Sequence, residues 1–302
     1  MDLLKSMQAY VAVVDAGSMV DASEQLGTSN AAVSRHLAAL EDHLGARLLN
    51  RTTRRLSMTP AGQDFYNRAQ TILADIAEAE TVAGATTSSP SGLLRISAPL
   101  SLGIGKLSQV LPGFIESYPD LRMDIDLSDR VVDLVNDGID VAVRIAREPA
   151  TTNVIARKIA PVRMIICAAP AYLKKHGRPT EPDELRAMAT LNYSYLSSGD
   201  SWTLTHSSGR QSLVRINPRV HATNGDILRE LAIAGHGIIM QPDFIVASAL
   251  AAGALEPVLD DWSIEGYHLY AVYLSRKFLT AKVRAFIDYL IASIGDSGSS
   301  IL

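Results

Sequence analysis

The chain has 302 residues, of which 47% are hydrophobic and 20% charged, and its formal net charge at pH 7 is −4. This composition predicts a globular chain of two or more domains, and no apolar run approaches the roughly 20 residues of a membrane span. The slightly acidic balance excludes a protein that coats nucleic acid non-specifically, and a single cysteine, Cys167, without a disulfide partner, is typical of the cytoplasm.

The first part of the chain predicts a helix-turn-helix. Leu3 to Ala16 has apolar residues at three- and four-residue steps, and its start does not resemble a secretion signal. Val20 to Ser29 predicts a short helix that ends at Gly27, a residue able to adopt the left-handed conformation. The next helix, Asn30 to Gly45, has an apolar stripe along one side, formed by Val33, Leu37, Leu40 and Leu44.

The opposite side of this last helix is slim and carries a few donors, as a helix that enters a DNA groove requires. Arg35 is the first candidate for base readout, because arginine can bond guanine bidentately, although a phosphate contact is the alternative. Ser29 is also expected to be the N-cap of this helix. His36 lies on the flank of the helix and is expected either to pack against the protein or to lie beside a phosphate. An ordinary helical hairpin would look similar. The candidate DNA contacts of the motif are Thr28, Ser29, Asn30, Ala31, Ser34, Arg35 and His36.

A basic segment follows, with four arginines and no acid between Arg47 and Arg55. Apolar and branched residues alternate there with the arginines, which predicts a two-stranded wing. Its side chains could reach phosphates or a minor groove, and the alternative is a solvated basic hairpin. The candidates in the wing are Arg51, Thr52, Arg54 and Arg55.

Thr59 and Pro60 predict a helix start, a hydroxyl cap followed by proline at the first helical position. The helix would run to about Ala83 and be about 35 Å long. Its apolar stripe has heptad spacing, which indicates dimerisation with a second copy, or else packing on the chain's own second domain. The stripe consists of Phe65, Ala69, Ile72, Ile76, Ala79 and Ala83. Gly84 to Gly92 is small, polar and broken by proline, as expected of a linker.

From Leu93 onward, branched-rich runs alternate with helical stretches, which predicts an α/β domain with a mixed sheet. The expected strands are LLRIS, RMDIDL, DVAVRI, VIARKI, VRMIICAA, 191–195, 211–216, GIIM and HLYAVYL, and the expected helices are 102–118, 131–138, 171–176, 227–234, 244–252 and 281–294.

The first sixty-odd residues strongly resemble the amino-terminal region of LysR-type transcriptional regulators. The resemblance rests on Ser34-Arg35, Leu40-Glu41, the RTTRR wing of Arg51 to Arg55 and the TPAG of Thr59 to Gly62, and it extends more loosely over the rest of the chain. Where many members have glutamine and proline, this chain has Asn30 and Ala31, which can alter the base that is read. Met19 replaces a common aromatic residue and is a core substitution.

The resemblance implies an α/β multi-domain architecture. A winged helix-turn-helix domain would span 1–59, a linker (dimerisation) helix and hinge 60–88, and an effector-binding domain 89–302. That last domain would have two lobes like type II periplasmic binding proteins, lobe I formed by 91–161 and 267–302 and lobe II by 162–266. The implied partners are double-stranded DNA with an interrupted palindrome, a small-molecule effector, and further copies of the chain in a dimer through the linker helix and a tetramer.

Strand-to-helix junctions of α/β sheets are common ligand sites, and the family's effector pocket would lie at such junctions between the lobes. A small or aromatic acid would suit Arg144 and the nearby donors, although Asp129 and Asp226 could repel it. Each of these residues is also compatible with a capping or surface role. The candidate effector residues are Ser97, Leu100, Ser101, Leu102, Asp129, Arg144, Tyr195, Asn224 and Asp226.

No motif of an enzyme is visible: nucleophile elbow, phosphate loop and paired carboxylates are all missing from the sequence. The seven histidines lack metal-ligand spacing, so neither cofactor nor metal is expected. Cys167 lies in an apolar run and is expected to be a buried hydrophobe rather than a redox sensor. The expected function is a sequence-specific, effector-modulated DNA-binding regulator. The alternative is a small-molecule-binding α/β protein or enzyme with an appended helical dimerisation domain.

Overall fold

The structure is a computed structural model that describes residues 2–51, 56–84, 90–147, 154–274 and 279–295. The chain divides into two compact units, residues 1–89 and, apart from 135–138, residues 90–302. Each unit is described by itself. In the described ranges, no helix is both long and apolar enough to cross a membrane.

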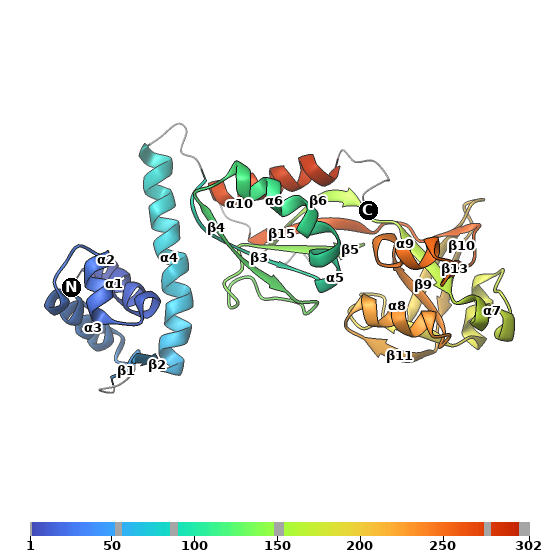
Figure 1. Ribbon diagram of the computed structural model, residues 1–302, viewed down its shortest axis with the longest axis horizontal. Coiled ribbons are helices and arrows are strands. Elements are labelled where there is room, and N and C mark those ends of the chain that lie inside the picture. Colours follow the sequence, from blue (N-terminus) through green and yellow to red (C-terminus); the bar gives the residue numbers. More distant parts are fainter. Residues whose placement is uncertain (1, 52–55, 85–89, 148–153, 275–278, 296–302) are drawn as a thin grey trace. The chain divides into compact units, whose positions relative to one another are not determined.

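Helices α1 (Leu3–Ala16), α2 (Met19–Gln25) and α3 (Asn30–Leu44) confirm the predicted helix-turn-helix of the first unit (Figure 1). Their apolar stripes meet in a core that includes Tyr10 and Leu37, both fully buried. The caps are those that the sequence predicts: the Ser29 side chain accepts a hydrogen bond from the amide of Ala32, and Gly45 ends α3 in the left-handed conformation. Strands β1 (Leu49–Arg51) and β2 (Leu56–Met58) pair antiparallel and form the wing.

Helix α4 (Pro60–Gly84) begins where Thr59 caps it by accepting a hydrogen bond from the Gly62 amide. The first part of its heptad stripe packs within the unit itself: the Phe65 ring lies 5.8 Å from that of Tyr10, and Ala69 is fully buried in the same core. Ala69 is therefore not available to a partner chain, whereas Phe65 is half-buried and dimerisation through the rest of the stripe stays a prediction. Ile72, by contrast, is 45% exposed. The side chains of Ala79 and Ala83 lie outside the described residues.

The first lobe of the second unit is built on a five-stranded sheet with the order β4-β3-β5-β15-β6. Strand β3 (Gly92–Ala98) runs parallel to β4 (Leu121–Leu127) and β5 (Val141–Ala146), whereas β15 (His268–Leu274) is antiparallel to β5 and β6 (Val154–Pro161). Helices α6 (Ser108–Ser117) and α10 (Ala281–Leu290) lie side by side on one face of the sheet, where Phe114 meets Phe286 edge to face (Figure 1). A short helical segment, α5 (Leu100–Leu102) and a π-helical turn (Gly103–Leu107), leads from β3 into α6.

The second lobe has a five-stranded sheet with the order β11-β8-β12-β7-β13 and a smaller sheet, β10-β9-β14. Because the chain leaves the first sheet after β6 and returns with β15, it crosses between the lobes twice. The strands are β7 (Met164–Ala168), β8 (Thr190–Tyr193), β9 (Ser201–His206), β10 (Gln211–Arg215), β11 (Pro218–Ala222), β12 (Ile238–Pro242), β13 (Glu256–Pro257) and β14 (Trp262–Ser263). The helices are α7 (Pro170–His176), a 3-10 helix (Pro182–Ala187), α8 (Gly225–Ile233) and α9 (Asp243–Ala251), and π-helical turns at Ile291–Gly295 extend α10 in the first lobe.

One predicted helix is wrong. Residues 131–133 have no regular secondary structure and 134–138 form turns, and Val131 is 81% exposed. The segment has a single buried apolar residue, Leu134, so a helix there would lack a core-facing stripe. The Asn136-Asp137-Gly138 sequence favours a turn, and Gly138 has a φ of +66°.

Candidate functional site

The outer face of α3 is available for contact with a partner. The side chains of Thr28, Asn30, Ala31 and Arg35 are exposed, and that of Ser34 is half-buried. Within the described residues, no hydrogen bond or ion pair holds the Arg35 guanidinium. The opposite side of the helix is anchored by fully buried Val33 and Leu37. The helix therefore presents one free cation and small polar side chains from a rigid support.

His36 differs from its neighbours on α3 because it is bonded within the unit. Its Nδ1 lies 3.3 Å from Oγ of Ser6 on α1, and the Ser6 hydroxyl donates to the backbone carbonyl of Asp2. Since that hydroxyl proton is used, the imidazole Nδ1–H is the donor to Ser6. This geometry supports the packing alternative for His36.

Glu41 joins α3 to the wing. Its buried carboxylate accepts hydrogen bonds from the amides of Leu48 (2.9 Å) and Leu49 (3.2 Å). The sequence singles out Glu41 only through the family resemblance, and these bonds supply its physical role. Thr52, Arg54 and Arg55 lie outside the described residues, as does the side chain of Arg51, so the wing contacts stay a prediction.

In the first lobe, the candidate effector residues meet where β3, β4 and β5 end. Arg144 donates from Nη2 to Oγ of Ser97 (2.9 Å) and to the carbonyl of Arg130 (3.2 Å), and from Nη1 to the carbonyl of Val143 (2.8 Å). The Ser97 hydroxyl donates in turn to Asp126 (3.3 Å). Burial lowers the pKa of Arg144, and nearby acidic groups oppose this shift. In the described part of the chain, the three hydrogen-bond acceptors of this guanidinium are all uncharged oxygens.

A second cluster links the two lobes through Asp129. Its carboxylate accepts hydrogen bonds from the amide of Leu100 in the first lobe (3.2 Å) and from the hydroxyl of Tyr193 at the end of β8 in the second (2.8 Å). Burial, and then the hydrogen bond to Asp129, raise the pKa of Tyr193. Sequence reasoning named Tyr195 and missed Tyr193. Tyr195 is 43% exposed and packs its ring edge against Tyr193, 5.9 Å away.

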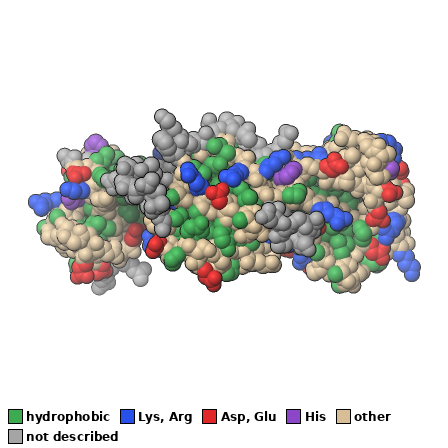
Figure 2. Space-filling view, turned by 90° about the horizontal axis from the view of Figure 1, so that it is seen from above, with side chains coloured by type: hydrophobic (Ala, Val, Ile, Leu, Met, Phe, Trp, Pro, Cys, Tyr) green, Lys and Arg blue, Asp and Glu red, His purple; other side chains and the backbone are tan. Residues whose placement is uncertain are grey.

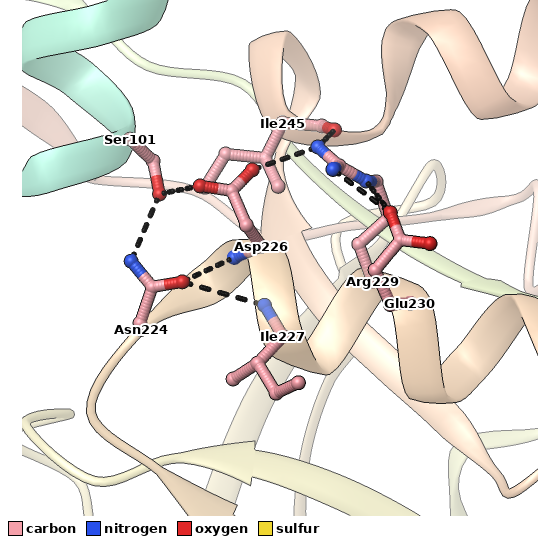
Figure 3. Close-up of polar contacts among 7 residues, drawn as sticks. All are labelled: Ser101, Asn224, Asp226, Ile227, Arg229, Glu230 and Ile245. Atoms are coloured by element: carbon pink, nitrogen blue, oxygen red, sulfur yellow. Dashed lines mark hydrogen bonds and ion pairs between the residues drawn. The ribbon is translucent and has the colours of Figure 1, made fainter.

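A third cluster, drawn in Figure 3, also crosses between the lobes. Ser101 of the first lobe donates to Oδ2 of Asp226 (2.6 Å) and accepts from Nδ2 of Asn224 (3.3 Å) at the start of α8. Asn224 caps α8 with its Oδ1, and Asp226 also accepts from Arg229 (2.7 Å). Leu102, in contrast, is fully buried in the apolar core. Its side chain packs in that core, and its role as an effector contact stays a prediction.

The mixture of charges on the surface is consistent with the small net charge of the chain. On the face seen in Figure 2, basic and acidic side chains are interspersed, and hydrophobic side chains reach the surface between them. The described residues contain no group of three or more His, Cys, Asp or Glu side chains that could hold a metal ion.

Two family models match the chain. Residues 4–63 match the bacterial regulatory helix-turn-helix protein, lysR family, and residues 87–294 match the LysR substrate binding domain. Among curated relatives, the HTH-type transcriptional regulator CrgA of Neisseria meningitidis serogroup C is 35% identical over 294 residues, 97% of both chains. The HTH-type transcriptional regulator DmlR of Escherichia coli K12 is 32% identical over 95% of this chain and 93% of its own length.

Solved structures with similar sequences have the same architecture. CrgA from Neisseria meningitidis, a LysR-type transcriptional regulator, superimposes with a TM-score of 0.58 at 34% identity, covering 97% of this chain and 99% of its own. The full-length virulence activator AphB of Vibrio cholerae has a TM-score of 0.58 at 32% identity, with 96% and 98% covered.

Proposed function

Because the chain belongs to the LysR family of bacterial regulatory helix-turn-helix proteins, we propose that α3 reads its operator and that the cleft between the lobes receives its effector. The protein is a DNA-binding transcriptional regulator modulated by a small molecule, and not an enzyme. We infer that this chain forms oligomers. The observation that carries the proposal is the exposed, donor-bearing face of α3, held on a buried core.

For DNA, Arg35 is proposed to bond guanine, with Ser29, Asn30 and Ser34 at phosphates or base edges and the wing arginines at the backbone. The capped start of α3 supports this, because the residues at this helix N-terminus, 28–31, are all exposed. Two copies joined through the distal part of α4 would read an interrupted palindrome, and two such dimers a tetramer. The site of action is the cytoplasm, where the chromosome lies.

For the effector, a small carboxylic acid is proposed to bind beside Arg144. This guanidinium is desolvated, and within the described part of the chain it makes no ion pair. A carboxylate would replace uncharged acceptors by a charged one, and charge-assisted bonds are about twice as strong as neutral ones. Ser97, Ser101, Asn224 and Asp129 would then surround the acid.

The DNA proposal is tested by Arg35→Ala in a mobility-shift assay on operator and scrambled DNA across a salt series. Loss of a bidentate guanine contact should cost about 1–3 kcal/mol on the operator and little on scrambled DNA. The control is Arg219→Ala, which removes the same charge from an exposed position on β11 of the second lobe. An equal loss of affinity for both DNAs would indicate that Arg35 contacts phosphates. No loss of affinity for either DNA would contradict the proposal that α3 reads the operator.

The effector proposal is tested by thermal shift with a panel of small carboxylic acids, each paired with its carboxamide. An acid at 100 times its dissociation constant adds about 2.7 kcal/mol to stability. Stabilisation by the acid should disappear in Arg144→Ala and exceed that by the carboxamide. If Arg144→Ala keeps the full shift, the site lies elsewhere.

A further inference from the structure

The two lobes of the second unit are joined by direct side-chain hydrogen bonds. Two of these bridges meet near α5: one runs from Asp129 to Tyr193, and one from Ser101 to Asp226 and Asn224. Elsewhere, Arg147 of the first lobe bonds the carbonyls of Thr203 and Glu265 in the second. Both bridges near α5 are held at its start in the first lobe: the Leu100 amide donates to Asp129, and the Ser101 hydroxyl donates to Asp226. Both end where an element of the second lobe ends or begins, at the carboxyl end of β8 and at the first turn of α8.

The Asp129 bridge unites a donor from each lobe on one carboxylate. The backbone amide of Leu100 holds the carboxylate in the first lobe at 3.2 Å, and the Tyr193 hydroxyl approaches from the second lobe at 2.8 Å. Hydrogen bonds to a charged acceptor are stronger than those between neutral groups. If the lobes separated here, the half-buried Tyr193 hydroxyl would have to find another acceptor.

The Ser101 bridge is anchored to α8 and α9 of the second lobe, as Figure 3 shows. Asp226 receives the Ser101 hydroxyl on one oxygen and the Arg229 guanidinium on the other. The same guanidinium donates to the carbonyl of Ile245 on α9 (3.0 Å) and pairs with Glu230 (2.9 Å). Since both carboxylate oxygens are held, Asp226 has little freedom to follow Ser101 if the first lobe moves.

We propose that these two bridges form a polar latch that keeps the lobes together when no small molecule is bound. Tyr193 and Asp226 are then positioning residues of the ligand-free regulator. A ligand that enters the cleft competes with the second lobe for Ser101 and Asp129, so the latch sets the state from which the effector starts. Only this last consequence rests on the proposed effector site.

The test measures the distance between the lobes in the full-length protein without added ligand. Cys167, the sole cysteine, is fully buried, so spin labels can be placed selectively on Glu116→Cys in α6 and Lys174→Cys in α7, both exposed. Mixing with excess unlabelled protein isolates one labelled chain per oligomer. Pulsed electron resonance should give a longer mean distance and a broader distribution in the double variant Ser101→Ala, Tyr193→Phe.

The controls make the same chemical changes inside one lobe. Ser117→Ala removes a hydroxyl bonded within α6, and Tyr172→Phe removes one bonded to the backbone of Ala189. Both should leave the distance unchanged. An unchanged distribution in the latch variant would overturn the proposal. Should that variant not fold, each single variant, which lacks one oxygen atom, is measured in its place, and parental distributions in both overturn it equally. The effector site stands or falls separately, on the thermal shift with Arg144→Ala.

Discussion

The substitution Gly62→Ala in α4 sets two physical effects against each other. Alanine inside a helix is more stable than glycine by about 0.5–1 kcal/mol. A Cβ at Gly62, however, would lie 2.1 Å from the backbone carbonyl oxygen of Leu48 and 3.0 Å from the Tyr10 hydroxyl. The obstacle is backbone, so it cannot rotate away. The start of α4 must therefore move away from the residue that precedes β1.

That movement disturbs the hydrogen bonds around the contact. The Leu48 carbonyl accepts from the Thr59 amide at 3.0 Å, and Tyr10 donates to the Gly62 carbonyl at 2.9 Å. Each bond contributes about 1 kcal/mol, and leaving a buried acceptor unpaired costs about 1–3 kcal/mol. After subtraction of the helix gain, Gly62→Ala should destabilise the first unit by about 2–3 kcal/mol.

The assay is urea unfolding of the full chain, followed by far-UV circular dichroism. Both tryptophans, Trp202 and Trp262, lie in the second unit, so their fluorescence reports that unit separately and should not change. Ala61→Gly is the control, since it introduces the opposite change at the adjacent, exposed position and costs only the helix propensity. A Gly62→Ala protein as stable as its parent, or more stable, would refute the steric reasoning.

Three further substitutions or reactions test other contacts. Glu41→Ala deprives two buried amides of their acceptor and should destabilise the first unit by about 2–4 kcal/mol, whereas exposed Asp42→Ala should stay within about 0.5 kcal/mol; equal effects would contradict this. Burial raises the pKa of Cys167 to about 12, so at pH 8 the thiolate is scarce and a thiol reagent should label only urea-unfolded protein; rapid labelling of the native chain would contradict this. Arg147→Lys removes a planar guanidinium that bonds the carbonyls of Glu265 (2.9 Å) and of Thr203 on β9 (3.3 Å). It should lower the stability of the second unit by about 1–2 kcal/mol in the fluorescence assay, and an unchanged unfolding midpoint would contradict this.

The first unit was predictable from the sequence because local signals determine it. The N-cap at Ser29, the left-handed Gly45 and the Thr59-Pro60 start each act within a few residues, and the structure has all three. The heptad stripe was only partly interpretable. Periodicity tells which side of α4 is apolar but not what covers it, and Phe65 and Ala69 are covered by the unit's own core.

The contacts between the lobes were less predictable because they join distant parts of the chain. The ends of β3 and α8 could be named from strand-to-helix junctions, but their partners depend on how two lobes meet. Ser101 and Asp226 are 125 residues apart, and Asp129 and Tyr193 are 64 apart. Nothing in the local sequence distinguishes Tyr193 from Tyr195. Strand β9 was also missed, although its alternation of buried Trp202 and Leu204 with less buried neighbours follows the strand period.

The sequence leaves open whether the acidic residues at the lobe contacts, Asp129 and Asp226, would repel an acidic effector. Asp129 and Asp226 each accept two hydrogen bonds from described residues of the second unit, and one of the two at Asp226 is its ion pair with Arg229. Their negative charge is thus partly compensated, whereas Arg144 donates only to neutral oxygens. An acid bound against Arg144 would gain a charge-assisted bond, but one placed at Ser101 would have to displace Asp226 from its donor. We therefore expect the two clusters to favour opposite chemistry: if the effector binds as proposed, its carboxylate lies at Arg144 and a hydrogen-bond donor of the same molecule lies at Asp226.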